Sequence, residues 1–223
     1  MRAEAKRWAV PAGLTLWCVS LVVLRVERSG SFMYAFLIWN LWLAWIPWMA
    51  GQAFRAASRR RATAARQLGW FALWILFLPN APYITTDLLH LRPRPLVPLW
   101  YDLALLLACA GTGLLLGYMS LLEVQAAVEE RFGPRKGWGV ATGALFLSGF
   151  GIYLGRFLRW NSWNVLTDPA GLFHDIAVRL LDPMSHSRTY GVTLIFGSGL
   201  LLGYASLRAL MASEVELLRK AVR

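Results

Sequence analysis

The side chains that could carry chemistry lie in two short stretches of an otherwise apolar chain. The first is Phe77-Leu-Pro-Asn-Ala-Pro-Tyr-Ile-Thr-Thr-Asp87 with the nearby His90, and the second is Gly155-Arg-Phe-Leu-Arg-Trp-Asn-Ser-Trp-Asn164. Asp87 and His90 are three residues apart, so they share a face if the helix continues. A carboxylate beside an imidazole can act as an acid–base pair or supply two metal ligands. The alternative is a hydrogen-bonded pair with a structural role, since buried polar groups need partners in any case.

The second stretch carries two arginines at helical spacing. Arg156 and Arg159 are three residues apart and precede the amide of Asn161. Two guanidinium groups with an amide donor can clamp a phosphate or a carboxylate. The alternative is structural, because an arginine at membrane depth needs a partner such as Asp87 or Asp102. The spacing alone leaves both interpretations open.

The candidate site residues come from these two stretches and from the start of the apolar run that begins at residue 99. The ligand-binding candidates are Asn80, Tyr83, Thr86, Asp87, Asp102, Arg156, Arg159, Asn161 and Trp163. If the protein is an enzyme, the catalytic candidates are Asp87 and His90, with His174 or Asp175 as further possibilities. The chain contains no nucleotide-binding loop, serine-hydrolase elbow or zinc-protease motif. We therefore predict neither a cofactor nor a bound metal.

The composition indicates an integral membrane protein. Hydrophobic residues make up 57% of the 223 residues and charged residues only 16%, against about 25% charged in a soluble domain. Twelve tryptophans fit this class, since indole rings favour the membrane–water interface. The net charge of +11 is better explained by basic loops and contact with lipid than by nucleic-acid binding, for which the chain has no motif. We expect membrane lipids, and no nucleic acid, as partners.

The apolar residues form six runs of the length that crosses a bilayer, so we predict an all-α, polytopic membrane protein with a single domain over residues 1–223. The predicted transmembrane helices cover residues 8–25, 32–51, 67–86, 99–122, 138–158 and 189–211. The first run is too long for a typical signal peptide and is expected to stay as a helix. Cys18 and Cys109 lie inside apolar runs and are expected to be small buried side chains.

The distribution of cationic residues predicts the orientation. With both termini in the cytoplasm of a bacterial inner membrane, the inner segments hold 15 lysines and arginines and the outer segments hold 8. The compact cluster between Arg55 and Arg66 contributes most to this difference. Inner loops are enriched in these residues, so this orientation is favoured and both polar stretches then face outward.

The last outer loop has the signals of a short amphipathic helix. Asp168 is a good N-cap, Pro169 suits the first helical position, and Asp182-Pro183 ends the helix. The apolar residues between them recur at helical spacing. We expect this helix to lie along the outer interface or to fold back over the transmembrane helices.

Pairs of glycines four residues apart occur in three of the six runs. They are Gly113 with Gly117, Gly139 with Gly143, Gly151 with Gly155, and Gly199 with Gly203. Small residues at this spacing let helix backbones approach closely. The pattern predicts a tight bundle of the last three helices.

The first polar stretch breaks a helix at membrane depth. Asn80 lies 13 residues after Gln67, which corresponds to about 20 Å of helix in a hydrocarbon core of about 30 Å. Pro79 and Pro82 each lack the N–H that would bond to a carbonyl four residues earlier. Such backbone is tolerated only inside protein or beside a wet cavity. The stretch is therefore either an unwound segment that builds a site, as in many transporters, or a kinked helix end capped by its own polar residues.

Three motifs carry a resemblance to a known family. The chain resembles the bacterial membrane proteins grouped as domain of unknown function family 1361 in residues 77–87, in Trp100-Tyr-Asp102 and in residues 155–163. An aspartate often follows the last tryptophan of that pattern, but this chain has Asn164 there, so that position carries no acidic role. The resemblance implies an integral membrane protein and supplies no reaction.

Three kinds of function fit these observations. The first is binding or transport of a small anionic or lipid ligand at the outer face, by the broken helix and the arginines. The second is a membrane-embedded enzyme that acts on a lipid-linked or envelope substrate. The third is an accessory or assembly subunit of a membrane complex.

Overall fold

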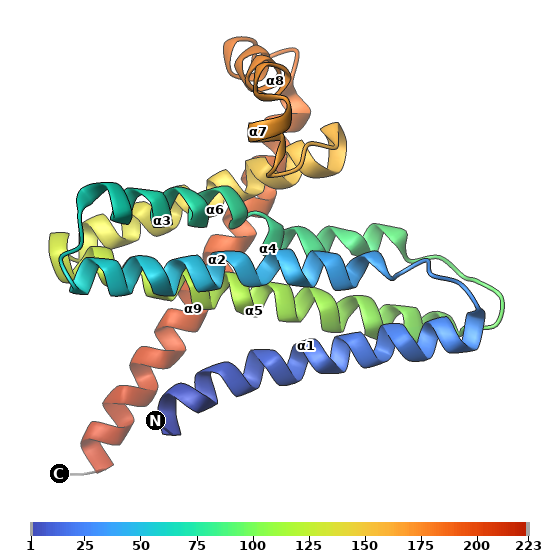
Figure 1. The fold of residues 1–223 in the computed structure, drawn as a ribbon, viewed down its shortest axis with the longest axis horizontal. Coiled ribbons are helices and arrows are strands. Elements are labelled where there is room, and N and C mark those ends of the chain that lie inside the picture. The colour runs from blue at the N-terminus through green and yellow to red at the C-terminus, as the bar shows by residue number, and fades with distance from the viewer. Residues whose placement is uncertain (1, 222–223) are drawn as a thin grey trace.

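The protein is built from helices, with no β-strand among the residues that the structure describes (Figure 1). This computed structural model describes residues 2–221, and side chains over residues 7–214. The long helices are α1 (Arg2–Ser29), α2 (Phe36–Arg59), α3 (Ala64–Phe77), α5 (Leu99–Phe132), α6 (Pro134–Leu158) and α9 (Ser187–Ala221). The short elements are α4 (Asn80–Tyr83), the 3-10 helix η1 (Ile84–His90), α7 (Asn164–Thr167) and α8 (Pro169–Leu181).

Five helical segments within the described part of the chain are long and apolar enough to cross a membrane. They are Arg7–Ser29, Ala64–His90, Leu99–Phe132, Pro134–Leu158 and Ser187–Glu214. The chain is therefore a multi-pass membrane protein. The predicted run 32–51 corresponds to α2, which is not among these five. α5 is longer than predicted, because it continues ten residues beyond position 122 to Phe132.

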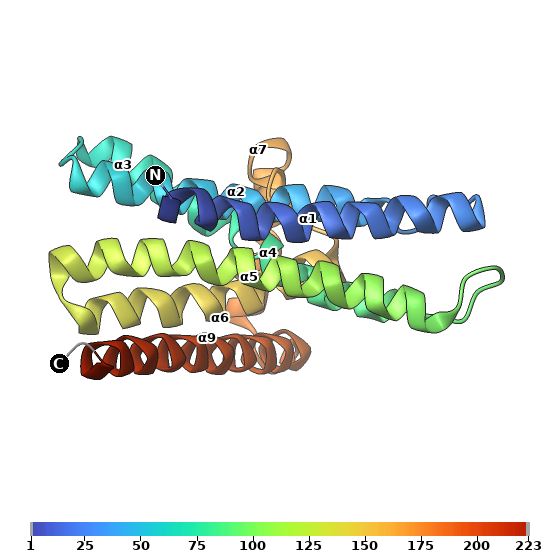
Figure 2. The ribbon, with the colours of Figure 1, turned by 90° about the horizontal axis from the view of Figure 1, so that it is seen from below.

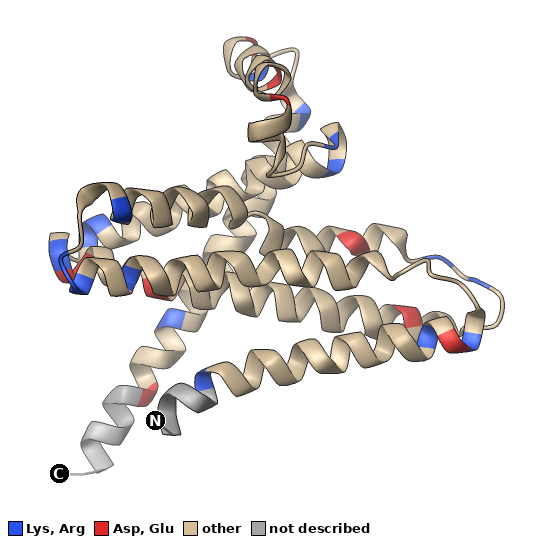
Figure 3. Cartoon of the chain, in the orientation of Figure 1, with Lys and Arg blue, Asp and Glu red and all other residues tan. Residues whose placement is uncertain are grey.

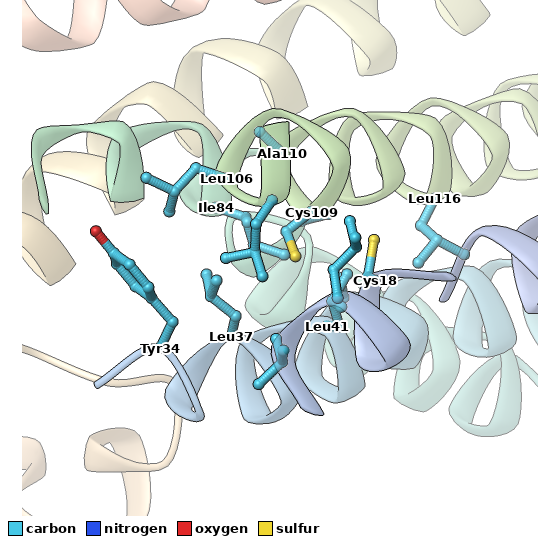
Figure 4. Packing of buried hydrophobic residues seen from close by; sticks show 14 of the residues in the cluster. Cys18, Tyr34, Leu37, Leu41, Ile84, Leu106, Cys109, Ala110 and Leu116 are labelled. Atoms are coloured by element: carbon cyan, nitrogen blue, oxygen red, sulfur yellow. The ribbon is translucent and has the colours of Figure 1, made fainter. Parts of the chain in front are cut away.

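The helices pack in successive layers around α5. Figure 2 shows α1, α2 and α3 on one side of α5, with α6 and α9 on the other. A hydrophobic cluster joins α1, α2, α5 and η1 through residues such as Leu37, Leu41 and Ile84 (Figure 4). Cys18 and Cys109 belong to this cluster as free, buried thiols, which confirms the prediction for both. A second cluster joins α2, α3, α5, α6 and α9.

The predicted break lies in the third apolar run, and it is a change of helix type rather than a loss of helix. α3 ends at Phe77, and the chain continues as the single turn α4 and then as η1. Both α4 and η1 pack against α5, and α4 also contacts α2 and α6. Ala81 and Ile84 are fully buried. The broken stretch is therefore inside the protein, as its free backbone groups require.

Glycines of α5 and α6 make room for this broken stretch. A Cβ atom at Gly113 would lie 2.5 Å from the carbonyl oxygen of Ala81, and one at Gly151 would lie 2.6 Å from the Pro79 ring. Gly117 faces the Ala81 side chain, and Gly155 faces Tyr83. These four glycines form a cradle for residues 79–84. We call them the glycine cradle.

The contacts of the paired glycines differ from the prediction that they bring the last three helices together. Gly139, Gly143 and Gly199 have no atom of another element within 4 Å of an added Cβ, so they bring no helices together. The close contact between α6 and α9 is made instead at Gly149 and Gly197. The spacing identified close approach in α5 and at the end of α6, where the partner is the broken stretch. In α9, Gly203 but not Gly199 faces another helix, at Tyr118 of α5.

The chain between α6 and α9 forms an arm that projects from the other helices (Figure 1). It holds α7 and α8, and α8 begins and ends at the expected positions. The Asp168 side chain accepts a hydrogen bond from the Gly171 N–H at 3.0 Å, as an N-cap does. Leu172 is buried, whereas Leu180 and Leu181 are exposed. That the helix lies along the membrane interface remains a prediction.

Candidate functional site

A cavity of about 580 Å³ lies where the broken stretch meets α2, the end of α6 and α8. Its apolar wall comes mainly from α2, α3 and α6, and includes Leu43, Ile75, Leu147, Phe150 and Leu154. Its polar lining gathers side chains from both of the stretches that the sequence singled out. They are Asn80, Tyr83, Asp87, His90, Arg156, Asn161, Ser162 and Trp163. The two stretches therefore meet, as predicted.

Asn80 and Ser162 hold the two stretches together at the helix break. The Asn80 amide donates to the Ser162 hydroxyl at 2.9 Å and to the Phe77 carbonyl at 3.0 Å. Ser162 in turn donates to the Leu76 carbonyl at 3.1 Å. Two carbonyls at the end of α3 thus receive side-chain donors in place of the next helical turn. Asn80 is a structural part of the cavity wall.

The threonines of η1 bond to the backbone in the same way. The Thr85 hydroxyl donates to the Pro82 carbonyl at 2.7 Å, and the Thr86 hydroxyl donates to the Tyr83 carbonyl at 2.6 Å. Both bonds satisfy acceptors that a regular α-helix would fill with backbone N–H groups. Thr86 is buried and contacts the cavity only through the arginine that it supports.

Asp87 is the buried centre of the polar cluster. Its carboxylate is 1% exposed and accepts from Arg156 Nη2 at 2.5 Å on one oxygen. The other oxygen accepts from the Asn40 amide at 2.9 Å. A charge at this depth needs such partners, and the ion pair is one of the alternatives considered for Arg156. Both oxygens of Asp87 therefore have a protein partner.

Arg156 is held on three sides but keeps one nitrogen for the cavity. Nε and Nη2 both donate to the Thr86 hydroxyl, at 2.9 and 2.6 Å. The guanidinium carbon lies 4.4 Å from the centre of the Tyr83 ring, at cation–π distance. Within the described side chains, no group accepts a hydrogen bond from Nη1. Arg156 lines the cavity, so Nη1 is left as a donor that a bound molecule could use.

His90 lies at the rim of the same cluster. Its Nδ1 is 3.2 Å from the Asp87 carbonyl oxygen and 3.9 Å from the Asp87 carboxylate. The His90 ring also packs against Phe36, with ring centres 5.5 Å apart. The expected proximity of Asp87 and His90 is present, although the closer contact is with the backbone.

Besides Thr86, two of the predicted ligand-binding residues do not line the cavity. Asp102 is buried, and its carboxylate accepts from Arg25 Nε at 2.8 Å, so it joins α5 to α1. Arg159 does not share a face with Arg156, because α6 ends at Leu158 and Arg159 is exposed in the left-handed conformation with φ 63°. The two-arginine clamp, one of the two alternatives that the spacing left open, is therefore not formed, and of the two arginines only Arg156 lines the cavity.

The remaining candidates lie on the loop after α6. Trp163 packs edge-on against Trp39 of α2, with ring centres 6.3 Å apart. Asn161 is exposed at the cavity, and its backbone N–H donates to Asn164 Oδ1 at 2.7 Å. Asn164 thus shapes the loop.

Three residues that matter were missed in the sequence. Asn40 is the one strongly polar side chain within the predicted run 32–51, which is a signal that could have been followed. Arg25 lies at the end of the first apolar run and resembles an ordinary flanking charge in the sequence. In the structure its side chain is only 2% exposed. Ser162 lies inside the second polar stretch but was not chosen among its candidates, because a serine in a loop is common.

The arm is tied to the cavity loop through Asp175. Trp160 Nε1 donates to Asp175 Oδ2 at 2.7 Å, and Arg179 Nη1 donates to Oδ1 at 3.0 Å. Burial alone would raise the pKa of Asp175, but these two hydrogen bonds and the charge of Arg179 lower the pKa below its usual value. The carboxylate therefore stays charged near neutral pH and keeps α8 against the loop.

The cavity places polar groups beside an apolar wall. It combines an apolar wall with the ion pair of Asp87 and Arg156. Further polar side chains come from Asn80 and from the loop at residues 160–163. Over the described residues, no three histidine, cysteine, aspartate or glutamate side chains gather as a metal site would require. Polar groups that converge in an apolar pocket are typical of a small-molecule site.

Comparison with known proteins places the chain in a family. No curated protein and no solved structure matches it significantly. One family model matches residues 39–202, which include the cavity, the glycine cradle and the arm, and it is described as a protein of unknown function (DUF1361). The chain therefore belongs to the DUF1361 family of proteins of unknown function.

Proposed function

We propose that the protein is a six-span component of the bacterial inner membrane whose outer cavity binds a lipid or a similar small amphipathic ligand. The observation that carries the proposal is the composition of the cavity. An apolar wall of α2 and α6 side chains adjoins Arg156, which lines the space of about 580 Å³ and whose Nη1 has no acceptor among the described side chains. A ligand with an apolar chain and an oxygen-rich head would satisfy both parts.

The six-span architecture is supported by α2. Its 24 residues correspond to about 36 Å of helix, enough to cross a bilayer core of about 30 Å. It packs along α3 and α5, and Figure 1 shows it running antiparallel to α1. Its tryptophans lower its hydropathy without preventing a position in the membrane.

The orientation is supported by the charges at one end of the molecule. Lysine and arginine gather at the α2–α3 loop and the α5–α6 turn (Figure 3). We assign this end to the cytoplasm, because inner loops carry the excess of cationic residues. Both termini then lie inside, and the cavity opens in the outer half of the membrane.

Ligand binding fits the polar cluster better than catalysis does. Asp87 is buried and already paired with Arg156 and Asn40, so taking up a substrate proton would break a buried ion pair. Because Asp87 neutralises Arg156, the pocket has no large excess of charge, and a lipid head that accepts one or two hydrogen bonds suits it better than a free multivalent anion. Trp39 and Trp163 at its edge fit a site near the outer headgroups.

The test compares two arginine substitutions three residues apart. Purified wild type, Arg156→Gln and Arg159→Gln would be analysed by native mass spectrometry for co-purified lipid. A charge-assisted hydrogen bond contributes about 1.5–3 kcal/mol, so we expect roughly tenfold or greater loss of retained lipid in Arg156→Gln. Arg159→Gln removes the same charge outside the cavity and should retain lipid like the wild type.

A double variant separates loss of ligand from loss of fold. Arg156→Gln alone leaves Asp87 buried without its cation, which destabilises the protein. Asp87→Asn with Arg156→Gln removes both charges together and should fold while still losing the lipid. If this double variant keeps its lipid, or if the wild type carries none in native-like bilayers, the proposal is wrong.

A further inference from the structure

A second hollow lies at the opposite end of the molecule from the outer cavity. It is a groove of about 620 Å³ between the start of α3, the end of α5 and the start of α6. Its apolar lining includes Phe54, Leu68, Phe71, Val128, Phe132 and Val140. Leu68 is 67% exposed and Phe132 is 52% exposed, so the groove is open at the side of the helix bundle.

Two cations lie at the end of this groove. Arg131 and Lys136 line it, and no carboxylate does. Both cations lie over the same ring, since the Arg131 guanidinium carbon is 5.1 Å and the Lys136 nitrogen 5.3 Å from the centre of Phe132. Arg131 Nη1 also donates to the Gln67 side chain at 3.1 Å, which fixes its position across the groove.

The nearby carboxylates of α5 are neutralised by other arginines. Glu130 accepts from Arg59 at 2.7 Å and from Arg55 at 3.1 Å. Glu129 accepts from Arg208 of α9 at 3.2 Å. Within the described side chains, Arg131 and Lys136 form no ion pair. Their positive charge is therefore available to a ligand at the end of an apolar groove.

We propose that this groove binds an anionic phospholipid. The headgroup phosphate lies between Arg131 and Lys136, and an acyl chain follows Phe71, Val128 and Val140 along the groove. Basic pockets between helix ends, with apolar walls that face the bilayer, suit such lipids. The site is separate from the outer cavity and does not depend on what that cavity binds.

The experiment measures lipid binding to the full-length protein. Native mass spectrometry of protein titrated with phosphatidylglycerol, and separately with phosphatidylcholine, would count bound lipids. Each cation near an anionic headgroup contributes about 1 kcal/mol, so the Arg131→Gln, Lys136→Gln double variant should bind phosphatidylglycerol roughly tenfold or more weakly. The wild type should prefer phosphatidylglycerol to phosphatidylcholine.

The matched control removes the same charge from the same end of the molecule. Arg60 and Arg61 are exposed on the α2–α3 loop and do not line the groove. The Arg60→Gln, Arg61→Gln variant should bind phosphatidylglycerol nearly as the wild type does. An equal loss in both double variants would mean diffuse attraction to the basic end and would overturn the proposal, as would unchanged binding in the groove variant. Unfolding temperatures of both variants confirm that they are folded.

Discussion

Asp87 is the residue whose contacts connect the elements around the outer cavity. It is almost completely buried, and its two oxygens are divided between Arg156 of α6 and Asn40 of α2. A charge pair in such surroundings costs free energy to desolvate, and its geometry must compensate for that cost. Asp87 therefore fixes where Arg156 points, and through Arg156 it sets the donor that a ligand meets.

This arrangement predicts strong coupling between Asp87 and Arg156. Asp87→Asn leaves a buried guanidinium without its anion, so the free energy of unfolding should fall by about 3–5 kcal/mol. The double variant with Arg156→Gln removes both charges and should be more stable than the sum of the two single losses implies. Denaturant unfolding in detergent measures all four proteins of the cycle.

A surface aspartate provides the control for this cycle. Asp182 is exposed at the end of α8, so Asp182→Asn should change the stability by no more than about 0.5 kcal/mol. If the stability losses of Asp87→Asn and Arg156→Gln simply add in the double variant, the two side chains are not coupled, and the ion pair is not the contact that organises this cluster.

At the same scale, the sequence revealed polar residues but not always their partners. Asn80, Asp87 and Arg156 were identifiable because polar side chains are costly at membrane depth. Arg159 was misplaced because its predicted position assumed that α6 continues, whereas a left-handed residue at φ 63° ends that helix. Asp102 was assigned to the ligand because its partner Arg25 lies 77 positions earlier, a separation that no local pattern reports.

At the scale of elements, the fold depends on the glycine cradle that holds residues 79–84. The broken stretch packs its backbone against α5 and α6, and the cradle glycines leave no room for a side chain at the closest points. The carbonyl of Ala81 is part of this contact, and a backbone atom cannot move aside as a flexible side chain can.

The cradle predicts opposite effects for two glycine substitutions. In Gly113→Ala the new methyl group would lie 2.5 Å from the Ala81 carbonyl oxygen, so we expect a loss of roughly 1–3 kcal/mol. In Gly139→Ala the methyl group meets no atom of another element, and the stability should stay equal or rise by up to about 1 kcal/mol. Thermal unfolding of both variants in the same detergent measures the difference.

The glycine spacing shows what a pattern can and cannot predict. Two glycines four residues apart indicate that a backbone can come close, which is correct for α5 and for the end of α6. The pattern does not name the approaching element, and at Gly139 and Gly199 no element approaches. The helix at 169–181 was predictable to the residue because Asp168, Pro169 and Asp182 act locally.

At the scale of the whole molecule, the two ends differ in their charged groups and in their cavities. The end with the outer cavity holds the broken stretch, the arm and two buried ion pairs around aspartates. The other end holds the basic loops, a set of arginine–glutamate pairs between α2, α5 and α9, and the open groove. The contrast suits a protein that meets different lipid leaflets at its two ends.

The proposed topology makes a direct prediction. In a variant with Cys18 and Cys109 replaced by serine, a single cysteine would be placed at Arg92 or at Arg60, both exposed. An impermeant thiol reagent added to intact cells should label position 92 and should label position 60 only after lysis. Labelling of both positions from outside would contradict the single span, Ala64–His90, that separates the two loops, and the reverse result would invert the orientation.

The glycine cradle also has a consequence for biosynthesis. Residues 79–84 leave the ribosome before α5 and α6, the two helices that hold them, have been made. Asp87 likewise precedes its cation Arg156 by 69 positions. The break after α3 can therefore reach its native place only after α6 has entered the membrane. A nascent chain shorter than this must keep Asp87 in contact with water or with the insertion machinery, and closure of the cavity is a late event of assembly.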